Sequence, residues 1–185
     1  MNKKILAVDL INAAKEQFQK NGYEKTQVDD ILRATKFTKN EFSEIFNSKE
    51  DGGLKVLKSY ERDQKDKFRK FEESVNARQR LSLYLDTFFD NAQEIARNGD
   101  PVLNLYYDLR NENNELSKMV VNILINQQNW IDEQFVIMMK TESARTIGDR
   151  LLAAINGLLL LVKLKNDPEM FKAQLIQLKS WIRSM

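Results

Sequence analysis

Residues 26–51 repeat one helix-starting pattern three times within a short length of chain. Each copy places a hydroxyl three residues before a carboxylate. At this spacing the hydroxyl accepts a hydrogen bond from a first-turn N–H, and the acid reaches back to the cap residue. The three pairs are Thr26 and Asp29, Thr38 and Glu41, and Ser48 and Asp51. The intervals predict two short helices and then a longer one, an arrangement typical of a DNA-binding helix-turn-helix that runs into a helical body.

Residue usage favours helix along the whole chain. Its 185 residues include only six glycines and two prolines, and Leu, Lys, Glu, Gln, Asn and Ala dominate. A chain of this length can bury a core of ordinary size, or a small module beside a larger one. We therefore expect an all-α protein of about nine helices, with a helix-turn-helix domain at residues 1–47 and a helical body at residues 48–185.

Cysteine and histidine are both absent from the chain. Their absence rules out a disulfide, a thiolate nucleophile, a thiolate metal ligand and the commonest general base. We expect neither a cofactor nor a bound metal. An enzyme would have to use carboxylates of the helical body such as Asp108, Glu112 or Glu115, and acids at helical spacing are usually solvated. The sequence thus predicts that the chain is not an enzyme.

No segment has the pattern of a signal peptide or a membrane span. Asp9 and Asn12 interrupt the apolar residues near the N-terminus. The longest apolar stretch, residues 151–162, is shorter than the roughly 20 residues that cross a bilayer. We expect a cytoplasmic protein with no membrane partner. The net charge of +2 permits DNA binding without arguing for it.

Apolar spacing predicts the helices of the N-terminal part. Helical spacing runs from Ile5 to Phe18, and Asn21-Gly22 supplies the left-handed stop expected just past a helix end. The next short helices are expected to share one core, formed by Val28, Ile31, Leu32, Phe37, Phe42, Ile45 and Phe46. Gly52-Gly53 lowers the helix propensity of the following segment, so we expect a mobile junction there.

The last two helices are expected to pair with a second copy of the chain. The apolar stretch 151–162 contains a single polar side chain, so it must be covered on more than one side. An isologous four-helix interface between two copies would cover it, whereas a helix buried in a monomer core is the alternative. The predicted interface residues are Leu151, Ile155, Leu158, Leu159, Val162, Leu178, Trp181 and Ile182.

The middle helices, expected at residues 77–98, 100–112 and 115–139, carry aromatic and methionine residues suited to an apolar pocket. Such residues at helical spacing are also common in an ordinary core. The candidate lining residues are Phe88, Phe89, Tyr106, Tyr107, Trp130, Phe135, Met138 and Met139. They predict a small, hydrophobic ligand.

Two segments match a known family by residue. One is Leu10-Ile11-Asn12-Ala13-Ala14-x-x-x-Phe18-x-x-x-Gly22-Tyr23-x-x-Thr26-x-Val28-Asp29-Asp30-Ile31, and the other is Phe46-Asn47-Ser48-Lys49-Glu50. They resemble the opening and the close of the DNA-binding domain of a TetR-family transcriptional regulator. The resemblance implies a helical homodimer that binds a palindromic operator, pairs through its last two helices, and releases DNA when a small molecule enters the second domain.

Carried over by position, the resemblance places the recognition helix at Thr38 to Glu44. It implies phosphate contacts by Thr26, Lys39 and Lys49. A bound phosphate would relieve the unfavourable dipole that a first-turn lysine meets, which supports the two lysines independently. Lys39, Asn40 and Ser43 could reach base edges or backbone, with Asn suited to adenine and Lys to guanine. The predicted DNA-binding residues are Thr26, Thr38, Lys39, Asn40, Ser43 and Lys49.

An alternative hypothesis keeps the fold but not operator recognition. Where the family pattern has a turn glycine, a phosphate-contacting tyrosine and an aromatic near the helix end, this chain has Lys36, Ser43 and Ile45. Glu41 and Glu44 also add negative charge to the helix that would face phosphates. The chain would then be a helical ligand-binding or protein-interaction module that has lost specific DNA binding.

Overall fold

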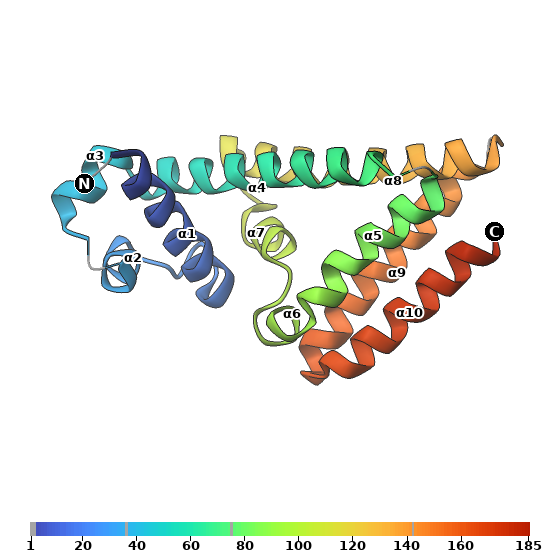
Figure 1. Cartoon of the computed structure of the whole chain (residues 1–185). Helices are drawn as coiled ribbons and strands as arrows, with labels where there is room; N and C mark the ends of the chain where they lie inside the picture. The colour runs from blue at the N-terminus through green and yellow to red at the C-terminus, as the bar shows by residue number, and fades with distance from the viewer. Residues whose placement is uncertain (1–2, 36, 75, 142) are drawn as a thin grey trace. The chain divides into compact units, whose positions relative to one another are not determined.

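The computed structural model describes residues 3–35, 37–74, 76–141 and 143–185, with side chains from Leu6 onward. The described residues fold into ten helices, which confirms the all-α class (Figure 1). The helices are α1 Lys3–Asn21, α2 Val28–Thr35, α3 Lys39–Ile45, α4 Lys49–Glu72, α5 Ala77–Asp90, α6 Ala92–Asn98, α7 Pro101–Leu109, α8 Glu115–Met139, α9 Ala144–Lys165 and α10 Pro168–Ser184.

The helix predicted over residues 77–98 is divided at Asn91. Its side chain donates a hydrogen bond to the Thr87 carbonyl at 2.7 Å, and its own N–H bonds to the Phe89 carbonyl. An asparagine side chain competes in this way with the helical pattern. The chain therefore turns between α5 and α6, which adds one helix to the predicted number.

The three predicted helix starts have different outcomes. The Thr38 capping box is complete, because Glu41 N–H donates to the Thr38 hydroxyl at 3.2 Å and Thr38 N–H donates to the Glu41 carboxylate at 2.8 Å. At the start of α4, Ser48 accepts from Asp51 N–H at 3.1 Å, but the Asp51 carboxylate accepts from Asn47 instead. Two of the three pairs therefore lie at helix starts, as predicted.

The Thr26 capping box is wrong. Helix α2 begins at Val28, and Asp30 accepts the Gln27 N–H at 2.8 Å. Thr26 is fully buried, and its hydroxyl donates to the Gly22 carbonyl at 2.7 Å and to the Gln17 carbonyl at 3.2 Å. The hydroxyl thus stabilises the end of α1 through hydrogen bonds and does not cap the start of α2.

The chain divides into two compact units. The first comprises the residues up to Asp63 together with Asp100–Ile123, and the second comprises Gln64–Gly99 and Leu124–Met185. Helices α4 and α8 each contribute residues to both units. The domain boundary predicted between residues 47 and 48 is not tested by this division and stays a prediction.

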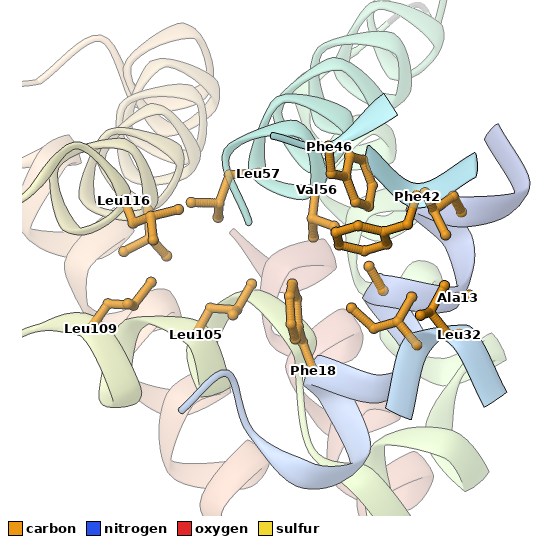
Figure 2. Close-up of a cluster of buried hydrophobic side chains, with 14 of the residues drawn as sticks. Ala13, Phe18, Leu32, Phe42, Phe46, Val56, Leu57, Leu105, Leu109 and Leu116 are labelled. Carbon is orange, nitrogen blue, oxygen red and sulfur yellow. The ribbon is translucent and has the colours of Figure 1, made fainter. Parts of the chain in front are cut away.

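The first unit has one apolar core to which α1–α4, α7 and α8 contribute. Figure 2 shows side chains of these helices pointing toward one another, including Phe18, Phe42, Val56 and Leu105. The rings of Phe42 and Phe46 meet edge to face at 5.1 Å. The predicted core of the short helices is confirmed: Ile31, Leu32, Phe42 and Phe46 are buried, and Val28, Phe37 and Ile45 are partly buried against them.

Gly52 and Gly53 have a packing role in this core. A Cβ at Gly53 would lie 2.9 Å from the Tyr23 ring and 3.0 Å from a Leu116 methyl, and one at Gly52 would lie 3.1 Å from the Phe46 ring. Both glycines are buried inside α4. Their small size lets the helix approach its neighbours closely, which argues against the mobile junction that we expected from their helix propensity.

In the second unit, α10 packs along α5 and α9, and α6 packs on α9 and α10 (Figure 1). The buried side chains of α9 form a single stripe, Leu151, Ile155, Leu159 and Val162, on the face turned into this unit. Among the described residues, no helix combines the length and the apolar character that a membrane span requires.

Candidate nucleic-acid interface

The predicted recognition helix α3 has one buried face and one exposed face. Phe42 is buried in the core of the first unit, while Lys39, Asn40, Ser43 and Glu44 are exposed. Lys36, which stands where the family pattern has a glycine, lies outside the described residues. Because α3 is anchored by its inward aromatic, its polar residues are presented to solvent.

Two acidic residues near α3, Glu41 and Asp30, are engaged at helix starts. The Glu41 carboxylate binds both the N–H and the hydroxyl of Thr38, and the backbone hydrogen bond is the main reason that the pKa of Glu41 is lowered. The pKa of Asp30 is lowered in the same way by the Gln27 N–H and then by Arg33. These carboxylates act as helix caps, so much of their charge is directed at backbone N–H groups.

Lys39 and Ser43 keep their charged and polar groups at the surface of α3. The Lys39 ammonium lies 3.4 Å from Asp29, and both side chains are mostly exposed, which makes this a weak and easily exchanged ion pair. The Ser43 hydroxyl donates to the Lys39 carbonyl at 2.9 Å. Its oxygen lone pairs remain able to accept, whereas its proton is used within the helix.

Lys49 lies in the first turn of α4, beside the turn that follows α1. Its Nζ donates to the Glu24 carbonyl at 3.0 Å and lies 4.6 Å from the centre of the Tyr23 ring. Partial burial lowers the pKa of Lys49, and the charge of Glu24 acts in the opposite direction. An ammonium has three donors, so a phosphate could be bound while the Glu24 contact is kept.

Thr26 is not available for the phosphate contact that the resemblance implied. Its side chain is fully buried, and its hydroxyl proton is shared between two carbonyls at the end of α1. A contact with DNA would require it to leave these partners. Thr38 is exposed, but its hydroxyl is held by Glu41 at 2.9 Å.

The predicted ligand-binding residues are divided between the two compact units. Tyr106 and Tyr107 belong to the first unit, where Tyr106 packs against the core and Tyr107 is 54% exposed beside Arg110. The others belong to the second unit, where Phe88, Trp130 and Phe135 are buried and Phe89, Met138 and Met139 are partly buried. A common ligand-binding site for these residues stays a prediction.

A groove of about 420 Å³ lies in the second unit between α4 and α8. Trp130 is the one predicted lining residue that reaches it; the ring stacks on Phe68 at 4.4 Å, and the indole N–H donates to Glu72 at 3.1 Å. The groove residues are Lys65, Phe68, Arg69, Glu72, Asn126, Asn129, Trp130 and Glu133. The other groove residues could not be predicted from the sequence, because the groove is formed by two segments far apart in the chain.

The predicted dimer residues are mostly turned inward. Leu151, Ile155, Leu159, Val162 and Ile182 are buried within the chain itself, and Leu158, Leu178 and Trp181 are partly buried. The buried stripe of α9 is packed against helices of its own unit. The large apolar residues left exposed on α9 and α10 are Leu160, Leu161, Leu164 and Ile176.

Comparison with known proteins agrees with this geometry. Residues 10–51 match the family model described as bacterial regulatory proteins, tetR family. This segment holds most of α1, all of α2 and α3, and the start of α4. No curated protein matches the chain by sequence.

Solved structures share the fold over nearly the whole chain. A TetR-family transcriptional regulator from Streptomyces coelicolor is 16% identical, with a TM-score of 0.85, and the match covers 96% of this chain and 93% of that one. The regulatory protein TetR from Rhodobacter sphaeroides is 20% identical, with a TM-score of 0.80 and coverage of 93% and 95%.

The fatty acid degradation regulator FadR from Bacillus halodurans is 18% identical, with a TM-score of 0.75, and the match covers 95% of this chain and 96% of that one. The chain therefore matches the tetR family model over its helix-turn-helix segment, residues 10–51, and shares the fold of these regulators along nearly its whole length.

Proposed function

We propose that the protein is a homodimeric repressor that binds a palindromic operator and is released by a small hydrophobic ligand. The observation that carries the DNA-binding half is the exposed polar face of α3. There Lys39, Asn40 and Ser43 are presented by a helix whose other face is anchored in the core. A short anchored helix with polar residues outward is the element that helix-turn-helix proteins place in the major groove.

The roles within this face follow from side-chain chemistry. Lys39 and Lys49 contact phosphates, and Asn40 contacts a base edge, for which an amide suits adenine. Thr26 is left out of the proposed contacts because its hydroxyl is buried. Glu41 does not oppose binding strongly, since its carboxylate is bound to Thr38 at the helix start.

The proposed dimer uses the outward faces of α9 and α10. Leu160 is 69% exposed and Leu164 is 76% exposed, which is unusual for two leucines one helical turn apart. Gly157 lies one turn before Leu160 or Leu161, and a Cβ there would meet nothing within 4 Å. Packing within the single chain does not require a glycine at this helical position. The absence of a side chain there would let a second chain approach the helix closely.

Pairing also suits the target. Two copies related by a two-fold axis present two recognition helices to the two halves of a palindromic operator. The inward stripe of α9 then holds the unit together, while the outward leucines hold the copies together. A leucine taken fully out of water contributes on the order of 1.5–3 kcal/mol, so a few such residues stabilise a dimer.

The ligand half of the proposal rests on the second unit. Phe88, Trp130 and Phe135 supply apolar surface there, and the partly buried Met138 and Phe89 are adjustable neighbours. The name of FadR concerns fatty acid degradation, so free fatty acids are a suitable first class of hydrophobic probe.

The test is an anisotropy titration of the purified protein against DNA from upstream of its own gene. It is run at two salt concentrations with nonspecific competitor, because phosphate contacts make affinity salt-dependent. Selective binding that weakens with salt supports the proposal, and added fatty acid should then release the DNA. Weak and unselective binding would favour a module that keeps the fold without operator recognition.

A further inference from the structure

We propose that Asp108 of α7 is a positioning residue for DNA binding, which sets the place of Lys49 by holding the Gly22–Tyr23 turn. The inference rests on the proposed function, in which Lys49 contacts a phosphate. The connected residues all belong to the first compact unit. They form a chain of contacts from the end of α7, through the turn after α1, to the first turn of α4.

The first contact joins Asp108 to the turn. The Tyr23 N–H donates to the Asp108 carboxylate at 2.7 Å, across 85 positions of sequence. Gly22 has φ +84°, and a Cβ at this residue would lie 2.9 Å from the same carboxylate oxygen. A glycine is thus required both by the left-handed backbone and by the close approach of the acid. The charged acceptor makes this hydrogen bond stronger than one to a neutral carbonyl.

The second contact fixes the Tyr23 ring. It packs edge to face on Phe18 at 5.1 Å, and Gly53 of α4 lies so close that a Cβ there would be 2.9 Å from the ring. Burial, with a contribution from the charge of Glu50, raises the pKa of Tyr23 to about 12. The ring therefore stays neutral and has little space in which to turn once its backbone is held by Asp108.

The third contact makes the position of Lys49 depend on the position of the turn. The ammonium lies over the Tyr23 ring at 4.6 Å and donates to the Glu24 carbonyl at 3.0 Å. Both partners belong to the segment that Asp108 fixes. When the carboxylate withdraws, the ring and the carbonyl shift together, and the ammonium loses the site that orients it toward a phosphate.

Asp108 lies in the last turn of α7, so a rearrangement of this helix would move its carboxylate. Such a change would weaken a phosphate contact without altering α3. It would therefore lower DNA affinity across sequences and leave sequence preference unchanged. This gives the protein a route by which α7 regulates DNA binding.

The experiment is a double-mutant cycle on duplex DNA, with D108A and D108N made alone and with K49A. D108A should weaken binding about fivefold to tenfold and reduce the salt slope by about one, because one phosphate contact is lost. D108N keeps a carbonyl acceptor for Tyr23 N–H and should bind nearly as the wild type does. In the K49A background, D108A should change the affinity less than about twofold. Equal losses in both backgrounds would overturn the proposal.

D86A is the matched control, since Asp86 is another acid in a cross-helix contact, with Lys179 at 2.5 Å. It should leave the salt slope unchanged. If D108A does not fold, D108E takes its place, because it keeps the charge and displaces the carboxylate by one methylene.

A second readout needs no DNA and separates this inference from the proposed function. The side-chain NMR signals of Lys49 should show the ring-current shift of Tyr23 in the free wild type. That shift should collapse in D108A and persist in D108N. If wild-type protein binds no DNA, the proposed function fails, and a collapse in D108A still supports the coupling. An unchanged Lys49 signal in D108A overturns the coupling in either case.

Discussion

At the residue scale, the exposed face of α3 and the start of α4 carry two kinds of proposed DNA contact, one to phosphates and one to a base edge. K49A should weaken binding by a similar factor on every sequence and lower the salt slope by about one, because it would remove the proposed phosphate contact. N40A should instead change sequence preference, by about 1–3 kcal/mol at one base pair. Titrations on the operator and on single-base variants distinguish the two.

K118A is the matched control for charge, since Lys118 is an exposed lysine paired with Glu115 on α8. It should alter neither property. If K49A and N40A have the same effect on all sequences, the assignment of phosphate and base roles is wrong.

Asp132 in the second unit is a residue whose charge opposes folding. One carboxylate oxygen is buried and has no hydrogen-bond partner among the described residues, and a Cβ at Gly148 would lie 2.1 Å from it. Burial raises the pKa of Asp132, with a further contribution from Asp149 and an opposing one from Arg145. A neutral side chain at this position should therefore suit the folded protein better.

The pH dependence follows from the direction of that shift. The folded state binds the Asp132 proton more tightly than the unfolded chain, so its penalty is absent below the unfolded pKa of about 4 and grows as pH rises through the raised folded pKa. D132N should raise the melting temperature at about pH 7 and leave it nearly unchanged at about pH 3. E133Q replaces an exposed neighbouring acid and should leave the melting temperature nearly unchanged at both pH values. A D132N melting temperature at or below that of the wild type at neutral pH would contradict this account.

At the element scale, close packing outweighs helix propensity in the first turns of α4. G53A gains about 1 kcal/mol of helix propensity but introduces a Cβ 2.9 Å from Tyr23 and 3.0 Å from Leu116. Overpacking of this kind costs about 1–3 kcal/mol, and the Tyr23 ring is held on its other side by Phe18. We expect a net loss of stability on the order of 1 kcal/mol.

Chemical denaturation measures the loss, and N122A gives the propensity gain alone because Asn122 is exposed on α8. Stabilisation by both substitutions would mean that the junction is as adaptable as its glycines suggested. Hydrogen exchange across residues 48–58 gives an independent measure of that adaptability.

Helix starts were predictable where local chemistry decides them. Asp100 and Asp167 cap α7 and α10, each just before a proline, with N–H donors of Leu103 at 2.8 Å and Met170 at 2.9 Å. The predicted Thr26 cap was wrong because a threonine hydroxyl can bond either to an N–H of the following helix or to carbonyls near the end of the preceding one. In the structure the buried hydroxyl donates to the Gln17 and Gly22 carbonyls. The residues adjacent to Thr26 in the sequence do not determine which of these hydrogen bonds forms.

At the scale of the whole molecule, the sequence does not show which side of an apolar helix is covered by other helices of the same chain. Residues 151–162 are apolar around the helix, so the sequence could not tell the inward stripe from the outward face. In the structure α6 and α10 pack on α9, and the buried side of α9 carries Leu151, Ile155, Leu159 and Val162. The Asp108–Tyr23 contact was missed for the same reason, because its partners are 85 positions apart.

The outward face leads to a prediction about assembly. L164E places a charge on a leucine that is 76% exposed in the single chain, so it should fold normally but lose association by roughly a hundredfold. L159A removes buried surface from the inward stripe and should cost about 2–5 kcal/mol of stability while leaving the outward face intact. Light scattering over a range of concentrations, together with thermal melts, separates the two effects. A dimeric L164E protein, or a monomeric and fully stable L159A protein, would show that the copies pair through another surface.

If the outward face is the interface, L164E should also lose affinity for the full palindrome and retain affinity for a half-site, because only the paired protein binds both halves at once.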